Sequence, residues 1–322
     1  MQSEGAFSVQ GTIDEVDRAI RGSPDPARAL LDLTIGAVRE DNPTLAEAIR
    51  YCAIPRRLDA QIVGVLRDAP GDRATNEKLL TGLASLHLVT PRSDNAYVYH
   101  DRRRTLLLEY WRSDAEKGAQ FDRFNQRLVT FYEAQHNGAQ ELEHDLERVK
   151  AVLLNANGNR YTQVASAVRQ RVLAPLFEAL YHETLRSAEA GYSLFSRYCE
   201  AYEARGLLTI CDSLRKAARD NLQGLPAGSN QEGPLKWLEY WEARILRSYR
   251  RNSEAEKILR ELLPKAAGDT KLKLWTLGDL GNSLHEQNKL REASEVYQME
   301  LALAKDMLFL TFDIDFQQID AR

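Results

Sequence analysis

The side chains that most often carry catalysis are sparse in this sequence and lack the spacings that catalysis requires. Six histidines and three cysteines are present. None of them belongs to an H-E-x-x-H or a C-x-x-C motif. His182 is followed by a glutamate but not by the second histidine of a zinc-binding helix. Asp313 and Asp315 come nearest to a carboxylate pair, and we interpret them as ordinary solvated charges. These residues predict neither a metal centre nor an enzyme.

Nucleotide-binding motifs are also absent from the sequence. It contains no G-x-x-x-x-G-K-[ST] loop, whose backbone amides and lysine cradle phosphates, and no G-x-G-x-x-G turn. We therefore expect no cofactor in this chain. ADP or ATP enters the prediction only if a separate nucleotide-binding domain supplies it.

Composition indicates a protein of the cytoplasm. The chain has 322 residues, 43% of them hydrophobic and 28% charged, with a net charge of −4, so no global basic field attracts nucleic acid or a membrane. No apolar run approaches the ~20 residues of a membrane span, and the N-terminus does not read as a signal peptide. Cys52, Cys199 and Cys211 form no disulfide framework. We expect Cys199 and Cys211 to be buried as small hydrophobes, with a redox or metal role as the alternative.

A stretch at residues 75–111 predicts a helix, a β-hairpin and a second helix. Two alternating segments, 86–90 and 96–100, are joined by a turn-prone Pro-Arg-Ser-Asp-Asn sequence, and Asp101 is predicted to cap the helix that follows. Apolar periodicity predicts three helices up to the hairpin, at 43–53, 57–67 and 75–87. Asp25-Pro26 and Asn42-Pro43 are each predicted to cap the start of a helix. The order of three helices, two strands and one helix is typical of a winged-helix domain, which we place at 42–112. Residues 1–41 are predicted to form a small helical bundle.

From residue 113 to 322 the sequence predicts an α-solenoid of degenerate tetratricopeptide-like helical hairpins. The fold class is therefore mainly α. Expected helix breaks are His136–Gly138, Asn157–Gly158, Gly191, Gly206, the 224–234 loop and Gly268.

The repeat pattern is clearest near the end of the chain. Gly281 is expected to let two helices approach closely, Ala293 to lie at their crossing, and Tyr297 to fill the groove between them. An earlier unit places Ala243 and Ala255 in similar roles. The alanines at 255 and 293 are 293 − 255 = 38 residues apart, a little over the tetratricopeptide period.

The first helices of these hairpins suggest a partner-binding surface. In such arrays they line the concave face, which favours a protein or an extended peptide as the partner. Trp237, Tyr240 and Trp241 recur at helical spacing and are interpreted as core, with a ligand-facing surface as the alternative. Aromatic, cationic and amide side chains make up the candidate surface: Tyr240, Arg244, Arg247 and Asn282.

A second function, DNA binding by the winged helix, has weaker support. Residues 102–104 are three consecutive arginines, but the helix that would enter the major groove offers only Asn76 and Lys78, beside Glu77. We expect a solvated or interdomain basic face there. A DNA-binding regulator with a repeat effector domain remains the alternative.

The combined order of bundle, winged helix and helical repeats resembles the C-terminal part of STAND-class signalling ATPases. The residues that carry the resemblance are 48–54 (AIRYCAI), 79–90 (LLTGLASLHLVT) and 97–111 (YVYHDRRRTLLLEYW). It implies that the bundle and winged helix clamp ADP held by an upstream nucleotide-binding domain, and that the repeats sense an inducer. It also implies that a histidine after the wing approaches the phosphate, a place that His100 matches. Since that ATPase domain is absent here, the chain is either a fragment or acts on an ATPase supplied by another polypeptide.

We expect this chain alone not to hydrolyse ATP, because it lacks the backbone cradle and the lysine that position phosphates. Phosphate release by homogeneous protein is the measurement. Steady turnover that a point change in this chain abolishes would contradict the expectation.

Overall fold

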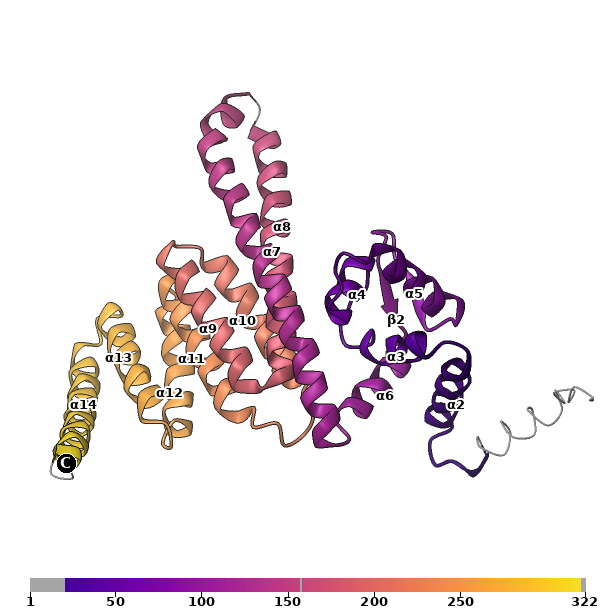
Figure 1. The fold of residues 1–322 in the computed structure, drawn as a ribbon. Coiled ribbons are helices and arrows are strands. Elements are labelled where there is room, and N and C mark those ends of the chain that lie inside the picture. The colour runs from indigo at the N-terminus through magenta and orange to yellow at the C-terminus, as the bar shows by residue number, and fades with distance from the viewer. Residues whose placement is uncertain (1–20, 157, 320–322) are drawn as a thin grey trace, which may run out of the picture. The chain divides into compact units, whose positions relative to one another are not determined.

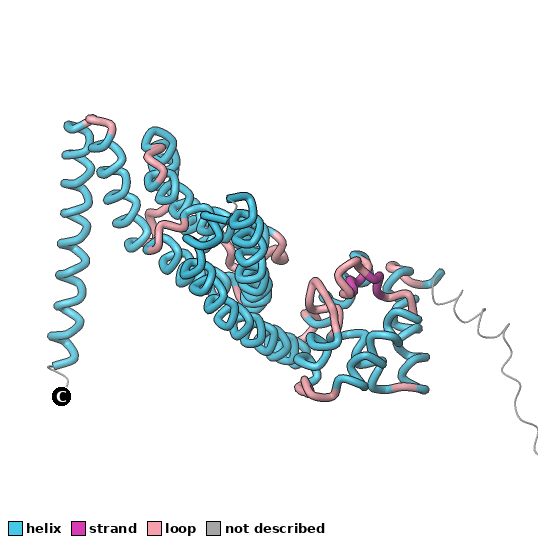
Figure 2. The backbone as a smooth tube through the Cα atoms, turned by 90° about the horizontal axis from the view of Figure 1, so that it is seen from above, coloured by secondary structure: helices cyan, strands magenta, loops and turns pink. Residues whose placement is uncertain are grey.

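In this computed structural model the described residues are 21–156 and 158–319, with only the backbone described for 140–170 and beyond 306. The expected features of residues 1–20 and the side chains of Asp313 and Asp315 lie outside them. Most of the described backbone is helical, which confirms the prediction of a mainly α fold (Figure 2). The chain divides into two compact units, the first ending at His182 and the second beginning at Glu183. The domain boundaries expected at 41/42 and 112/113 stay predictions.

The first unit opens with helices that begin at the expected caps. The Asp25 carboxylate accepts from two backbone amides at the start of α2, and Asn42 accepts from the Leu45 amide at the start of α3. A proline occupies the first turn of both helices, where its missing N–H costs nothing. The helices up to the hairpin are α2 (Pro26–Asp41), α3 (Pro43–Tyr51), α4 (Ala60–Arg67) and α5 (Arg73–Ser85).

A two-stranded hairpin follows, as the sequence predicts. Strand β1 (Val89–Pro91) pairs antiparallel with β2 (Tyr97–Tyr99). The Tyr99 hydroxyl donates to the Ile49 carbonyl at 2.9 Å, which ties the hairpin to α3. Buried aliphatic side chains from the surrounding helices fill the core, among them Ile49, Leu66, Leu83 and Leu107. The expected order of three helices, two strands and one helix is therefore present at 43–111.

Helix α6 (Asp101–Trp111) corrects one local prediction. Its N-cap is His100, and Asp101 is its first helical residue, with no side-chain capping hydrogen bond. The carboxylate still lies in the first turn, where the positive end of the helix dipole favours it. The expectation that Asp101 caps this helix is wrong by one position.

Helices α7 (Ala115–Ala156) and α8 (Gly158–Arg186) lie side by side as a long hairpin (Figure 1). The break expected at 136–138 is wrong, because α7 runs through it. His136 is fully buried there, and its Nδ1 lies 2.7 Å from the Val172 carbonyl of α8. The polar residue that suggested a break instead joins two helices. Helix α7 ends at Ala156 and α8 begins at Gly158, and Asn157 of the expected break lies outside the described residues.

A buried polar cluster attaches the end of α8 to the rest of the first unit. The His182 ring stacks on Tyr132 with centroids 5.9 Å apart, and its Nδ1 lies 2.8 Å from Asn125 Oδ1. Burial, and then the cations Arg56 and Arg104, hold the pKa of His182 well below its ordinary value. The ring is therefore neutral in the folded protein. This cluster explains why the first compact unit extends to His182.

The second unit is a row of helices in which each packs against the next. Helices α9, α11 and α13 also contact one another in sequence, so the first members of three successive pairs are adjacent (Figure 1). The helices are α9 (Ala188–Ala204), α10 (Leu208–Gln223), α11 (Glu232–Ser248), α12 (Asn252–Lys265), α13 (Thr270–Glu286) and α14 (Leu290–Ile319).

The glycines of this unit have two different roles. Gly206 adopts a φ of +72° between α9 and α10, and Gly268 lies between α12 and α13, so both breaks are confirmed. The loop expected at 224–234 ends at residue 231, because α11 begins at Glu232. The break expected at Gly191 is wrong, since Gly191 lies inside α9. A methyl group there would lie 2.3 Å from Thr184 Oγ1 and 2.8 Å from Thr184 Cα. Gly191 thus permits a close contact between α8 and α9.

Gly281 has the contact role predicted for it. A methyl group at this position would lie 2.4 Å from Cε1 of Tyr297, on α14. The Tyr297 hydroxyl donates to Asn282 Oδ1 at 2.9 Å, which fixes the ring over the glycine. Ala293 is buried at the same crossing, as Ala243 and Ala255 are in the preceding pair. Small residues therefore set the spacing of the hairpins.

We expect Gly281→Ala to destabilise the protein by ~1–3 kcal/mol, because the added methyl overpacks against a ring that its hydrogen bond holds in place. Gly278→Ala is the matched control on the same helix. Its methyl would meet only the terminal carboxylate of Glu300, which can rotate away. Alanine's better helix propensity then makes that variant neutral or more stable by up to ~1 kcal/mol. Urea unfolding measures both, and equal effects would contradict the close-contact role of Gly281.

Candidate ligand-binding groove on the first helices

A groove of about 490 Å³ lies across the three adjacent first helices of the second unit. Helix α9 supplies Tyr192 and Ser193, α11 supplies Trp237, and the start of α13 supplies Lys271 and Trp275. We call this pocket the aromatic groove, after the rings of Tyr192, Trp237 and Trp275 that line it. Its remaining lining residues are Ser196, Arg197, Glu200 and Asp269.

The rings of the groove form a continuous row from α9 to α13. The centroids of Tyr192 and Trp237 are 5.9 Å apart, and those of Trp237 and Trp275 are 5.7 Å apart. The two tryptophan rings stand at 83° to each other, an edge-to-face geometry that aromatic pairs favour. A side chain entering this corner would meet the face of one indole and the edge of the other.

Acidic and basic groups in the groove differ in how they are engaged. Asp269 caps α13 by accepting from the Leu272 amide at 2.9 Å, and its second oxygen accepts from Trp237 Nε1 at 2.9 Å. The Lys271 ammonium lies 5.2 Å from the Trp275 centroid and 5.9 Å from that of Trp237. Lys271 is exposed, and such contacts at exposed sites are worth only ~0.5–1 kcal/mol. The lysine is therefore an exposed cation of the groove that is held only by weak contacts with the rings.

Two of the predicted partner-binding residues meet at one carboxylate. Tyr240 is buried, and its hydroxyl donates to Asp279 Oδ2 at 2.8 Å. Arg247 donates to the other oxygen of Asp279 and forms an ion pair with it. Burial and the neighbouring Asp279 raise the pKa of the Tyr240 phenol. This cluster joins α11 to α13.

The other two predicted residues also have contacts within the second unit. The Arg244 guanidinium donates to Glu203 on α9 at 2.9 Å and lies 5.0 Å from the centroid of Trp241. Asn282 accepts from Tyr297. All four predicted residues are thus engaged in joining helices to one another.

The sequence favours a core role for the aromatic stripe on α11, with a ligand-facing surface as the alternative, and the structure divides the stripe between core and surface. Tyr240 and Trp241 are buried, as a core stripe requires. Trp237 is only half-buried and lines the groove. Sequence reasoning missed Tyr192 and Trp275, because only their contacts with Trp237 in the folded protein identify them, and the three residues lie on separate helices.

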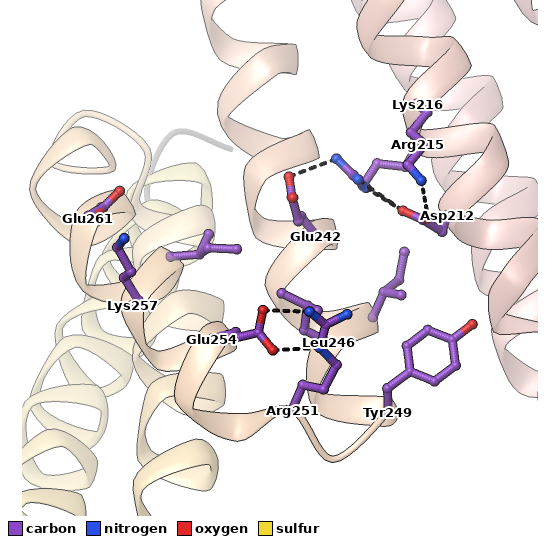
Figure 3. A pocket seen from close by; sticks show the side chains of 12 residues that line it. Asp212, Arg215, Lys216, Glu242, Leu246, Tyr249, Arg251, Glu254, Lys257 and Glu261 are labelled. Atoms are coloured by element: carbon purple, nitrogen blue, oxygen red, sulfur yellow. Dashed lines mark hydrogen bonds and ion pairs between the residues drawn. The ribbon is translucent and has the colours of Figure 1, made fainter.

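A second cleft, between α10, α11 and α12, is lined by charges of both signs (Figure 3). The buried Arg215 donates to Asp212 and to Glu242, and Arg251 forms a bidentate ion pair with Glu254. Its charged lining comprises four cations and four acids: Arg215, Lys216, Arg251 and Lys257, with Asp212, Glu242, Glu254 and Glu261. The cleft therefore has no net charge with which to select a ligand.

In the first unit, His100 lines a largely apolar cavity of about 540 Å³ between α2, residues 86–88 and α6. The ring is exposed, with Nε2 3.4 Å from the Thr90 hydroxyl. Arg102 pairs with Asp25 at 3.4 Å, and Arg103 donates to the His87 carbonyl. His100 thus lies beside two arginines.

The cysteines are buried, as expected. Cys52, Cys199 and Cys211 are fully buried free thiols, and Cys211 Sγ donates to the Cys199 carbonyl at 3.4 Å. Among the side chains that the structure describes, at 21–139 and 171–306, no cluster of three His, Cys, Asp or Glu residues is placed to hold a metal ion. In the same part of the chain no helix combines the length and apolarity needed to cross a bilayer.

Comparison with known proteins finds no relative: no protein-family model, curated protein or solved structure matches this chain.

We expect Arg247→Ala to destabilise the protein by ~1–3 kcal/mol, because the substitution leaves a partly buried carboxylate, Asp279, without its cation. Lys257→Ala, which removes an exposed lysine from α12, should change stability by less than ~0.5 kcal/mol. Thermal unfolding followed by circular dichroism compares the two variants. An unchanged Tm for Arg247→Ala would mean that the ion pair does not join α11 to α13.

Proposed function

We propose that this chain is a non-enzymatic regulatory module of a STAND-type signalling ATPase. In this proposal residues 42–112 are a winged-helix clamp, and the second unit is a tetratricopeptide-like sensor that binds a protein partner. The observation that carries the proposal is the exposed aromatic groove along three adjacent first helices, since a recognition surface of a helical repeat protein lies on such helices.

The packing of the hairpins supports the sensor half of the proposal. The close approach of Tyr297 to Gly281 and the burial of Ala293 are consistent with the roles that a tetratricopeptide pattern gives these positions. The groove has aromatic rings for affinity and polar groups for orientation, which suits a protein segment. Because Tyr240, Arg244, Arg247 and Asn282 already join helices, we now assign partner contact to the groove and interhelix support to these four residues.

The surroundings of His100 support the clamp half. Two histidines, His87 and His100, and two arginines border a largely apolar cavity, and such donors suit a phosphate at an interface with an ATPase domain. In this proposal the nucleotide is held by the partner ATPase, and His100 contacts its phosphate.

DNA binding by the winged-helix region has less support, because several of its basic side chains are already paired with acids. Arg73 pairs with Glu77 on α5, Arg57 with Asp94 beside the hairpin turn, and Arg67 with Asp72. Counterion release from phosphates needs cations that are available to them.

The proposal is tested by capture of proteins from a native extract with the full chain, in ADP and in ATP. We expect the captured proteins to include one with a P-loop, retained more strongly in ADP. His100→Ala should lower its recovery at least tenfold, and the exposed histidine control His285→Ala should not. Absence of a P-loop protein, or capture that ignores His100, would refute the clamp.

A further inference from the structure

We propose that the aromatic groove binds an extended, proline-containing acidic segment of a protein partner, with Lys271 as the residue that pairs with its carboxylates. This inference rests on the proposed function, because it names the chemistry that the proposed sensor recognises. It concerns residues that the STAND resemblance does not single out.

The ring geometry selects the apolar part of the ligand. Trp237 and Trp275 form a corner of nearly perpendicular indoles, and Tyr192 continues the row on α9. A narrow row of half-buried rings receives an extended strand more readily than a helix, because the diameter of a helix with side chains is ~10 Å. Proline-rich segments are already extended and lose little conformational entropy on docking into aromatic-lined grooves.

The charges select the polar part of the ligand. Asp269 already has a donor on each oxygen, from Trp237 and from the Leu272 amide. Lys271 rests over the two indoles, and the described part of the chain shows no ion pair at its ammonium. A flexible lysine at this position can turn from the rings to a ligand carboxylate without losing an acid partner. Lys271 therefore gives the groove one cation that can pair with a carboxylate of the ligand.

A single-stranded nucleic acid also combines ring stacking with negative charge, but this groove suits it poorly. A nucleic-acid strand carries a phosphate charge at every nucleotide, whereas the groove lining offers only two cations, Arg197 and Lys271, and they are matched by two acids, Glu200 and Asp269. Proteins that bind single-stranded nucleic acids instead place their stacking rings in a positively charged groove that runs along the backbone. An oligonucleotide is therefore an outcome to be tested against the peptide.

The probe is a fluorescein-labelled peptide of five Pro-Glu dipeptides, titrated into the full chain and followed by fluorescence anisotropy. We expect saturable binding that weakens with added salt. A peptide of five Pro-Lys dipeptides tests the charge, five Ser-Glu dipeptides test the proline, and a ten-nucleotide oligothymidine tests the nucleic-acid reading. Each should bind at least tenfold more weakly than the Pro-Glu peptide.

Matched variants locate the site. Lys271→Glu should lower the affinity for the Pro-Glu peptide at least tenfold, whereas Lys273→Glu, on the same helix but outside the groove, should not. Trp275→Leu should have an effect of the same size, and Tyr249→Leu, which removes an exposed ring from the end of α11, should have none. Circular dichroism establishes that each variant is folded. If a groove variant does not fold, Lys271→Met, which keeps the aliphatic stem, replaces it and should lose the salt dependence.

Absence of saturable Pro-Glu binding would overturn the inference, as would equal binding of the Pro-Lys or Ser-Glu peptide. Tighter binding of the oligothymidine, lost in Lys271→Glu, would overturn it in favour of nucleic acid. If the peptide fails while the P-loop protein is still captured through His100, only the partner chemistry is wrong. If capture fails while the peptide binds, the proposed clamp is wrong and the groove stands.

Discussion

The second unit depends on close contacts between helices at positions without a bulky side chain. Gly191 lies against Thr184, and Gly281 lies against the Tyr297 ring, at distances that no added carbon would tolerate. The buried alanines at 243, 255 and 293 continue the same pattern along the row. Interiors are packed to crystal-like density, so such contacts fix helix spacing rather than merely permit it. Once the spacing is fixed, α9, α11 and α13 become neighbours.

The contacts among α9, α11 and α13 both hold the candidate site together and form its lining. On the supporting side, Asp279 receives Tyr240 and Arg247, and Glu203 receives Arg244 across to α9. These partly buried pairs replace hydration by fixed hydrogen bonds between consecutive first helices. On the exposed side, the same helices bring the rings of the groove within about 6 Å of one another. A rigid scaffold of this kind lowers the entropy cost of binding an extended segment.

Local signals in the sequence predict most of the helices but assign some glycines and polar residues the wrong role. The caps at Asp25 and Asn42 are correct because an N-cap needs only a side chain and a nearby amide. Gly191 and His136 suggest breaks, yet both lie inside helices, because their role is a contact with another helix that local sequence does not reveal.

The candidate site is less predictable than the fold, for the same reason. The sequence identifies Trp237 as part of an aromatic stripe, but it does not show that Trp237 is partly exposed while Tyr240 and Trp241 on the same helix are buried. Tyr192 and Trp275 join it only through tertiary packing, from helices that begin 44 residues before and 38 residues after the start of α11 (232 − 188 and 270 − 232). The arginines that the sequence favours for partner binding are instead used to hold the first helices together.

The most direct measurement of where this protein binds its partner is site-specific photo-crosslinking of the full chain in its native extract. Benzoylphenylalanine replaces Ser193 in the aromatic groove in one variant and Lys257 in the charge-balanced cleft in another. Both positions are exposed and lie in the same unit. A partner that recognises the first helices is expected to form a covalent adduct from position 193 and none from position 257. Adducts from position 257 alone, or equally from both positions, would contradict recognition through the aromatic groove.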